Sequence, residues 1–233
     1  MDFQEGVILG FDKPYHWTSF DVVGKVRWLI CRHLGVKKLK VGHAGTLDPL
    51  ATGVLIVCTG RATKRIEELQ SGTKEYIADI RFGATTPSFD LEKPIDATYP
   101  TTHITREAVE ECLKRFKGTI EQIPPTFSAC KIEGKRAYLM ARKGKEVELK
   151  PKTLVIDEIE LMECNIPDIR IRVVCSKGTY IRALARDLGE ALESGAHLTA
   201  LRRTRTGNVR VEDCLDPEHF EEILPGLTTG LNI

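Results

Sequence analysis

The sequence predicts an α+β fold with a mixed or antiparallel central sheet flanked by helices. Stretches with the two-residue repeat of β-strands and stretches with the 3.6-residue repeat of helices both occur along the chain, without a strict strand–helix–strand order. No internal repeat or low-complexity tract interrupts them. At 233 residues, the chain is long enough for one large domain or two small ones.

The first predicted elements are a strand at residues 7–11 and a helix at residues 20–34. Ser19 is expected to be the N-cap of this helix and Gly35 its terminator. The apolar positions of the helix fall on one face, namely Val22, Val23, Val26, Leu29, Ile30 and Leu34. The helix is therefore expected to cover the sheet with that face.

Residues 42–53 read GHAGTLDPLATG, and Asp48 is the single carboxylate in this run. Glycine, proline and small residues break regular structure, so the run predicts a loop. Residues 54–58, VLIVC, predict a buried strand directly after it. An acid on an irregular loop beside a core strand is well placed to be a rigidly held reactive group.

The later elements follow from the same patterns. Residues 61–70 predict a helix, and residues 75–82 alternate as a half-buried strand with Tyr76 on the apolar side. Thr105 is expected to begin a helix that Gly118 closes. Residues 169–173 predict another strand, and Thr179 is expected to open a helix that buries Ile181, Leu184, Ala185 and Leu188.

The net charge is only +1, but residues 1–210 hold all 34 basic residues and 27 of the 33 acidic ones, a net charge of +7. A basic body suits a polyanionic partner, although a solvated charged surface explains the same pattern. Residues 124–152 are especially basic and are either a surface excursion or a functional flap. Because they offer little apolar surface, we expect them to be mobile without a partner.

Several classes of function have no support in the sequence. The seven cysteines form no CxxC pair, which favours reduced thiols in a cytoplasmic protein. There is no secretory signal and no apolar run long enough to span a bilayer. No metal, nucleotide-triphosphate or dinucleotide motif occurs, so neither a metal site nor a cofactor is expected.

Six blocks together carry a resemblance to a known family: 8–21 (ILGFDKPYHWTSFD), 42–53, 60–64 (GRATK), 74–76 (KEY), 175–182 (CSKGTYIR) and 195–203 (GAHLTALRR). In order and content they resemble the motifs of the TruB family of tRNA pseudouridine synthases. The resemblance implies a pseudouridine-synthase-like fold. It also implies isomerisation of one T-loop uridine of tRNA, at position 55, without a cofactor or an obligatory protein partner.

The resemblance also assigns catalytic roles. Asp48 would be the catalytic acid, Arg182 would keep it ionised, and the ring of Tyr76 would stack on the target uracil while its hydroxyl can accept the C5 proton. A single acid suits this chemistry because the base itself returns to the sugar, whereas glycosidases need a second carboxylate for water. The alternatives are a loop-capping Asp48, a solvated Arg182 on an amphipathic helix and a tyrosine that only fills the core.

Further residues would bind the RNA. His43 would occupy the space left by the extruded uridine, and Tyr180 and Leu201 would line the pocket. Asp90 would support the active-site loop. The lysines and arginines expected to contact phosphates are Lys13, Lys64, Lys177, Lys131, Lys135 and Arg136. A turn-capping role for His43, core packing for Tyr180 and Leu201, and ordinary solvation for the lysines are the alternatives.

We therefore expect residues 1–215 to form a catalytic domain, with residues 124–152 as its mobile RNA-binding flap. Residues 216–233 are expected to be a short acidic tail in place of the full PUA-type domain of many family members. Two other functions remain open: a tRNA-folding helper in which catalysis is secondary, and a guide-RNA-dependent pseudouridine synthase.

Overall fold

The computed structural model describes residues 1–125, 131–132, 135–136 and 149–228. The chain divides into two compact units. The first unit comprises Met1–Tyr76 and Arg202–Ile233, and the second comprises Ile77–Leu201. Strands β4 (Lys74–Phe82) and β12 (Ala196–Thr206) each contain residues of both units. The predicted α+β class is confirmed, with a mixed sheet and flanking helices.

The sheet of the first unit is built around β3 (Ala51–Thr59). Strand β1 (Ile8–Lys13) pairs with it in antiparallel fashion, with Lys13 opposite Gly53. Strand β2 (Val41–Ala44) also pairs antiparallel with β3, with Ala44 opposite Ile56. Residues 45–50, which include Asp48, therefore close a β-hairpin. The C-terminal part of β12 pairs with the short strand β13 (Val209–Arg210).

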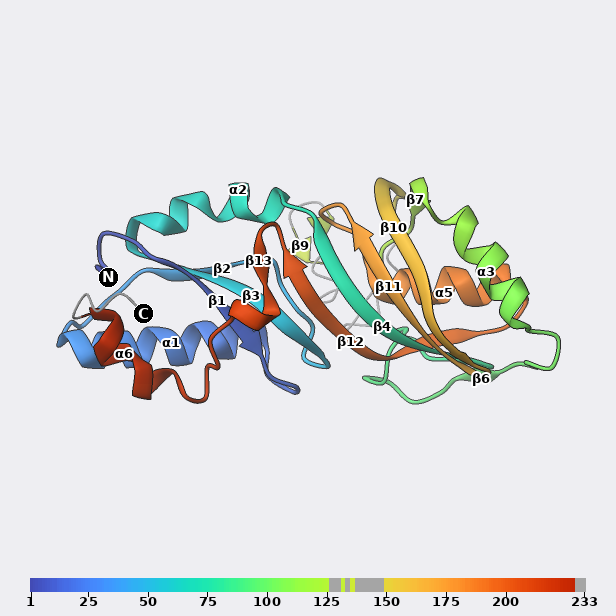
Figure 1. The fold of residues 1–233 in the computed structure, drawn as a ribbon, viewed down its shortest axis with the longest axis horizontal. Coiled ribbons are helices and arrows are strands. Elements are labelled where there is room, and N and C mark those ends of the chain that lie inside the picture. Colours follow the sequence, from blue (N-terminus) through green and yellow to red (C-terminus); the bar gives the residue numbers. More distant parts are fainter. Residues whose placement is uncertain (126–130, 133–134, 137–148, 229–233) are drawn as a thin grey trace. The chain divides into compact units, whose positions relative to one another are not determined.

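Helices cover both faces of these strands. Figure 1 shows α1 (Ser19–Leu34) and α6 (Phe220–Thr228) on one side of the first unit and α2 (Ile66–Ser71) on the other. Helix α2 follows the 3₁₀ turn η1 (Gly60–Arg65), and a second 3₁₀ turn, η2 (Val211–Asp213), follows β13. The predicted helix over residues 61–70 is thus confirmed as a 3₁₀ turn that continues into α2.

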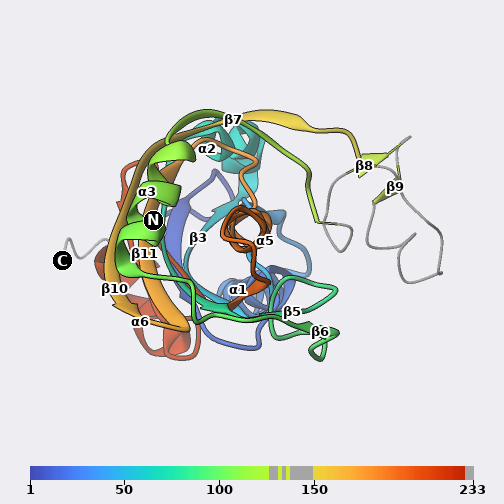
Figure 2. The ribbon, with the colours of Figure 1, turned by 90° about the vertical axis from the view of Figure 1, so that its right-hand side faces the viewer.

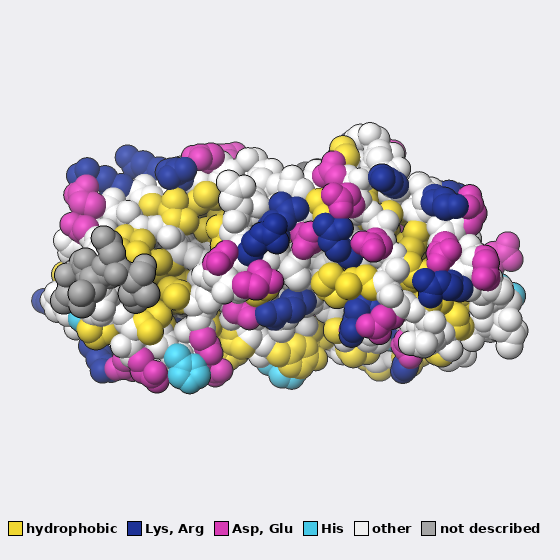
Figure 3. Space-filling view, viewed as in Figure 1, with side chains coloured by type: hydrophobic (Ala, Val, Ile, Leu, Met, Phe, Trp, Pro, Cys, Tyr) yellow, Lys and Arg dark blue, Asp and Glu magenta, His cyan; other side chains and the backbone are white. Residues whose placement is uncertain are grey.

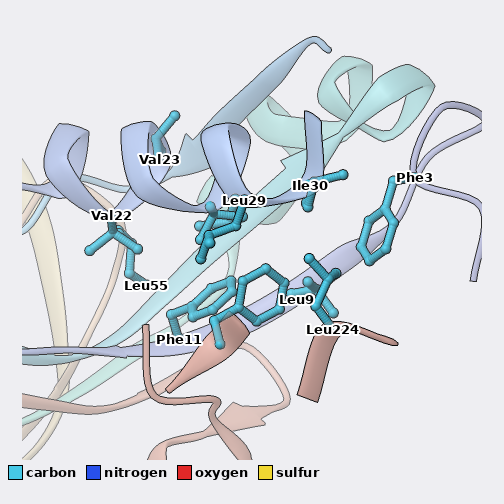
Figure 4. Close-up of a cluster of buried hydrophobic side chains, with 12 residues drawn as sticks. Phe3, Leu9, Phe11, Val22, Val23, Leu29, Ile30, Leu55 and Leu224 are labelled. Atoms are coloured by element: carbon cyan, nitrogen blue, oxygen red, sulfur yellow. The ribbon is translucent and has the colours of Figure 1, made fainter. Parts of the chain in front are cut away.

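Strand β3 is buried on both faces because each face meets a separate apolar cluster. Leu55 and Val57 join the cluster between β1, α1 and α6, which includes Phe3, Phe11 and Phe220 (Figure 4). The opposite side chains of β3 pack beneath α2 in a second cluster of Ala44, Val54, Ile56 and Cys58. The continuous apolar run at residues 54–58 was correctly predicted as a buried strand.

Two local predictions in the first unit are wrong in detail. The N-cap of α1 is Thr18 and not Ser19, because Thr18 and Asp21 form a capping box. Gly35 does end the helix, in the left-handed conformation with φ 65°. The run at residues 42–53 is a loop only at 45–50, since both its ends pair in the sheet.

Gly53 shows why glycine-rich sequence can still be a strand. It lies in β3 with φ 103°, and an added Cβ would lie 2.1 Å from the carbonyl oxygen of Arg203. Only glycine permits this close approach of β3 to β12. The glycine that suggested a loop is therefore a requirement of strand packing.

The expected acidic tail at residues 216–233 is also different in the structure. Helix α6 has buried side chains at Phe220 and Leu224, and the ring of Phe220 meets that of Phe11 edge-on with centroids 5.1 Å apart. The acids that suggested a solvated tail, such as Glu221 and Glu222, lie on the outer side of this helix. The described part of the segment is thus a core element of the first unit.

In the second unit, β4 (Lys74–Phe82), β11 (Asp168–Cys175), β10 (Lys152–Asn165) and β7 (Gly118–Gln122) are neighbours in that order. Strand β10 is antiparallel to both β11 and β7. Helix α3 (Arg106–Arg115) lies against β10, and α5 (Ile181–Ala191) lies within the curve of β10 and β11 (Figure 2).

Short strands complete the second unit. Strands β5 (Ala84–Thr85) and β6 (Ala97–Thr98) form one antiparallel ribbon. Strands β8 (Lys131–Ile132) and β9 (Lys135–Arg136) form another. The predicted flap at residues 124–152 falls largely on 126–130, 133–134 and 137–148, which lie outside the described residues.

Most periodic elements predicted for the second unit are confirmed. Thr105 caps α3, and its core face buries Val109, Cys112 and Leu113. The alternation of β4 and β11 holds, with Ile80 and Ile171 on buried positions. Helix α5 begins at Ile181, and its N-cap is Tyr180 and not Thr179, because the hydroxyl of Thr179 donates to the carbonyl of Ser176 instead of capping the helix.

Candidate active site

The loop that carries Asp48 is held on its N-terminal side by Ser19. The Ser19 hydroxyl accepts a hydrogen bond from the amide of Leu47 (2.8 Å) and donates one to the Leu47 carbonyl (3.1 Å). Both residues are buried. One side chain at the start of α1 thus satisfies both polar backbone groups of the residue before Asp48. The prediction of Ser19 as an N-cap missed this role.

Lys13, at the end of β1, holds the other side of the loop. Its ammonium donates to the carbonyls of Pro14 (2.9 Å), Trp17 (2.6 Å) and Pro49 (3.4 Å). Its side chain is buried, and this burial lowers the pKa of Lys13 to about 8, while the charge of Asp48 opposes the shift. A buried ammonium enclosed by carbonyls favours a structural and electrostatic role over the expected phosphate contact.

Arg203 is a further buried cation beneath the loop. Its guanidinium donates to the carbonyl of Val54 (2.8 Å) and to that of Gly45 (3.0 Å), the first residue of the loop. Only 2 % of Arg203 is exposed. The sequence placed Arg203 in a recognised block without assigning it a role. Asp48 is therefore presented between three fixed points of the backbone.

Tyr76 and His43 belong to the same unit as Asp48. Tyr76 lies on the buried side of β4 and is 8 % exposed, as its alternation predicted. His43 is half-buried in β2, opposite Val57 of β3. The alternative of a turn-capping histidine does not fit this strand position. The role of each at the uracil stays a prediction.

Arg182 is buried in the second unit, so the alternative of a solvated helix residue is wrong. Only 4 % of it is exposed. Its guanidinium donates to the carbonyl of Ser88 (3.0 Å) and lies 3.7 Å from a carboxylate oxygen of the buried Asp90. Asp90 also accepts from the amide of Glu92 (2.9 Å). This ion pair connects α5 to the loop at residues 86–92. The support of the active-site loop by Asp90 stays a prediction.

Tyr180 and Leu201 lie in the second unit as well. The side chain of the buried Gln122, at the end of β7, bonds both the amide (2.9 Å) and the carbonyl (3.2 Å) of Tyr180. This contact fixes the backbone at the start of α5, and the Tyr180 ring is half-buried there. Leu201 is half-buried in β12. Gln122 is a residue that the sequence did not indicate.

The remaining lysines differ in their surroundings. Lys64 in η1 and Lys177, in the turn between β11 and α5, are exposed, as phosphate contacts require. Lys131, Lys135 and Arg136 lie in β8 and β9, but their side chains are outside the described part of the chain. The predicted phosphate contacts of all five remain expectations.

The face of the second unit seen in Figure 3 alternates basic and acidic side chains. On the sheet, Arg81 pairs with Asp168 at 2.8 Å, Arg170 with Asp79 at 2.6 Å and Arg172 with Glu158 at 2.7 Å. Because each arginine has an acidic partner, this sheet face is not a uniform basic surface. The net positive charge of residues 1–210 is therefore not concentrated in these three pairs on the sheet.

Within the described ranges, no group of three or more histidine, cysteine, aspartate or glutamate side chains is arranged to hold a metal ion. Over the same residues, none of the helices combines the length and apolar character needed to cross a bilayer.

Comparison with solved structures shows a related fold. The chain aligns over 99 % of its length, with a TM-score of 0.72 and 29 % identity, with a chain of the "Crystal Structure of a Cbf5-Nop10-Gar1 Complex". It spans 58 % of that chain. A chain of the "Structure of H/ACA RNP bound to a substrate RNA containing 2'-deoxyuridine" aligns with a TM-score of 0.68, 27 % identity and coverage of 97 % and 56 % of the two chains.

Two family models that match this chain place it in the class of pseudouridylate synthases. Residues 32–181 match the model "TruB family pseudouridylate synthase (N terminal domain)", and residues 182–225 match "tRNA pseudouridylate synthase B C-terminal domain". A protein of Phocaeicola vulgatus called tRNA pseudouridine synthase B is 75 % identical over 96 % of this chain and 95 % of its own length. A protein of the same name from Flavobacterium johnsoniae is 50 % identical over 96 % and 98 %. The chain belongs to the TruB family.

Proposed function

We propose that this chain converts the uridine at position 55, in the T-loop of tRNA, to pseudouridine. The family makes the chain an isomerase of the pseudouridylate synthase class. Relatives that match almost the full chain carry the name tRNA pseudouridine synthase B, which supports tRNA as the substrate. The T-loop position rests on the resemblance of the sequence blocks.

The reaction breaks the bond between the ribose and N1 of uracil, turns the base and forms a bond from the ribose to C5, from which a proton leaves. No redox change and no hydrolysis occur, so an external cofactor has no step to perform. The reaction needs a negative group at the ribose, an acceptor for the C5 proton and a site that holds the freed uracil. We assign these roles to Asp48, Tyr76 and the pocket residues predicted with them.

The observation that carries the proposal is the support of the Asp48 loop. Residue 47 is held by Ser19, residue 49 by Lys13, and residue 45 by Arg203. A reactive carboxylate gains most from such support because a fixed position lowers the cost of reaching the transition state. A loop-capping aspartate would not need its neighbours to be held by three buried side chains. The geometry therefore favours catalysis over a purely structural Asp48.

The uridine must leave its stack to reach a side chain, which costs a few kcal/mol. We propose that His43 occupies the vacated space and that Tyr180 and Leu201 line the pocket for the extruded base. Arg182, held by Asp90 in the second unit, completes the catalytic set in this proposal. Exposed Lys64 and Lys177 would supply phosphate contacts, which give affinity without sequence selection.

We propose that the chain acts without an obligatory protein partner in the cytoplasm. Its identity with proteins named tRNA pseudouridine synthase B reaches 75 %, against 29 % for the chain from the Cbf5-Nop10-Gar1 complex. The stand-alone reading is therefore favoured over the guide-RNA-dependent alternative. Activity on a T-arm hairpin with no other component would support it directly.

The test is incubation of the purified protein with an unmodified T-arm hairpin, followed by mapping of pseudouridine at single-nucleotide resolution. The wild-type protein should modify one T-loop uridine in the presence of EDTA. Asp48→Asn should abolish the product, to below about a hundredth of the wild-type rate, and leave RNA affinity within a few-fold. Asp213→Asn, a change of the same kind at an exposed site in the same unit, is the matched control and should leave the rate unchanged.

Pseudouridine formation by Asp48→Asn at more than about a hundredth of the wild-type rate would overturn the assigned role. RNA binding without any product from the wild-type protein would instead favour the tRNA-folding helper. Modification of a uridine outside the T-loop would keep the class of enzyme and change the substrate site.

A further inference from the structure

Two exposed rings, Tyr15 and His16, lie in the turn between β1 and α1. Tyr15 is 48 % exposed, and His16 is exposed as well. The ring centroids are 4.1 Å apart with an angle of 54° between the planes. Neither ring contributes to the apolar clusters of the first unit. Their position at the surface therefore needs a reason other than packing of the core.

The turn that carries these rings is joined directly to the Asp48 loop. The amide of His16 donates to the carbonyl of Pro49 at 2.9 Å, and the ammonium of Lys13 joins the carbonyls of Pro14, Trp17 and Pro49. Pro49 follows Asp48 in the sequence. The two rings are thus fixed to the backbone one residue away from the proposed catalytic group.

His16 has a backbone conformation that favours glycine. Its φ is 66°, in the left-handed region, which residues with a Cβ adopt at a cost in stability. The ring is exposed and gains little from burial, so glycine at position 16 would give a folded state of at least equal stability. A side chain kept in such a conformation beside a proposed active site suggests a function for that side chain.

An aromatic pair at the surface fits the face of a nucleotide base. Bases in single-stranded loops stack on tyrosine and histidine rings, and this contact tolerates any base because each has a π-face. His43 is proposed to occupy the space of the target uridine itself, and a neighbouring base that leaves the stack as the loop opens also presents its face. A ring pair next to Asp48 is suitably placed to cover it.

We infer that Tyr15 and His16 form a stacking site for a base of the tRNA loop next to the target uridine. The inference rests on the proposed function, since it takes the RNA at Asp48 as given. The site binds and positions the RNA without taking part in bond making. It selects an opened loop over a stacked one, because only an uncovered base presents its face.

The test compares dissociation constants of the T-arm hairpin for wild type, Tyr15→Ala, Tyr15→Phe and His16→Gly. Removal of either ring should weaken binding by at least about fivefold, the lower range for loss of one stacked base. Tyr15→Phe should bind within twofold of wild type, because it keeps the ring. Trp28→Ala, which removes a 56 % exposed ring from the outer side of α1 in the same unit, is the control and should also stay within twofold.

Two further readouts separate stacking from other roles. The slope of binding against salt concentration should stay unchanged in Tyr15→Ala, because no phosphate contact is removed. The melting temperature of His16→Gly should lie no more than about 2 °C below that of wild type, since glycine relieves the strain of the left-handed backbone at position 16. Weaker RNA binding by a protein of undiminished stability is the expected combination.

Binding by Tyr15→Ala and His16→Gly within twofold of wild type would overturn the inference, as would equal losses in Tyr15→Phe and Tyr15→Ala. A large drop in the melting temperature of both variants would show that the rings serve the fold. These outcomes concern affinity alone. A wild-type protein that binds the hairpin but forms no pseudouridine would contradict the proposed function and leave this comparison valid.

Discussion

The hydroxyl of Ser19 provides the most direct test of how the Asp48 loop is held. In Ser19→Ala, the carbonyl and amide of Leu47 lose their partner, and the amide is buried with Leu47 only 4 % exposed. An unsatisfied buried group costs about 1–3 kcal/mol, and this is the expected loss in the free energy of unfolding. Because the loop and not the RNA surface is changed, the hairpin should bind as it does to wild type.

The rate should fall more clearly than the affinity. Residue 47 precedes Asp48, so freedom at Leu47 shifts the carboxylate, and a displacement near 1 Å can cost on the order of 100-fold in rate. We expect a decrease of about tenfold or more in single-turnover pseudouridine formation at saturating RNA. Ser71→Ala, which removes an exposed hydroxyl that donates to the Glu68 carbonyl, is the control.

Urea unfolding and single-turnover kinetics on the same preparations decide the outcome. A Ser19→Ala protein that loses less than about 0.5 kcal/mol and keeps its rate would refute the account of the loop. A loss of stability with an unchanged rate would show that the loop is held by Lys13 and Arg203 alone.

Three further predictions concern buried groups. With its pKa lowered to about 8, Lys13 is charged below that pH and neutral above it, so the rate of pseudouridine formation should decline as the pH rises through about 8. Lys13→Met should be slow at every pH and lack this decline. A flat wild-type profile from pH 7 to 9 would contradict the prediction. Asp90→Asn removes the charge that faces the buried Arg182 and should cost about 3 kcal/mol in urea unfolding, whereas Glu68→Gln at an exposed pair should leave the free energy of unfolding nearly unchanged. Equal losses in the two variants would disprove the assigned burial. Phe220→Ala should cost about 3–5 kcal/mol, and a value below about 1 kcal/mol would show that α6 is dispensable.

Sequence patterns identified the elements that bury one regular face. Helix α1, strand β4 and helix α5 show clean periodicity, because apolar side chains at their inner positions alternate with polar ones outside. Strand β10 has no such pattern: Leu154 and Ile156 are buried, while Val155 and Met162 are exposed. Strand β12 was missed for a different reason, since the buried positions in its C-terminal half are polar residues.

The candidate site was predictable as residue types and less so as contacts. Asp48 and Tyr76 were indicated by their local sequence, and the burial of Tyr76 is confirmed. The support of the loop was not predictable, because a serine or arginine that binds backbone carbonyls far along the chain leaves no periodic signal. The spacing of Thr18 and Asp21 is that of a capping box, which leaves the Ser19 hydroxyl available to bond Leu47.

The first unit is assembled from the two ends of the sequence, and this affects the order in which the protein can form. Its core needs Phe220 and Leu224 against Phe3 and Phe11, so it stays incomplete on the ribosome until the last helix has emerged. The second unit is one continuous segment and has all its strands in place earlier. Synthesis of the protein therefore leaves the strands next to the Asp48 loop exposed for longest, and a chain that stops before residue 220 lacks the side chains of α6 in the core of its first unit.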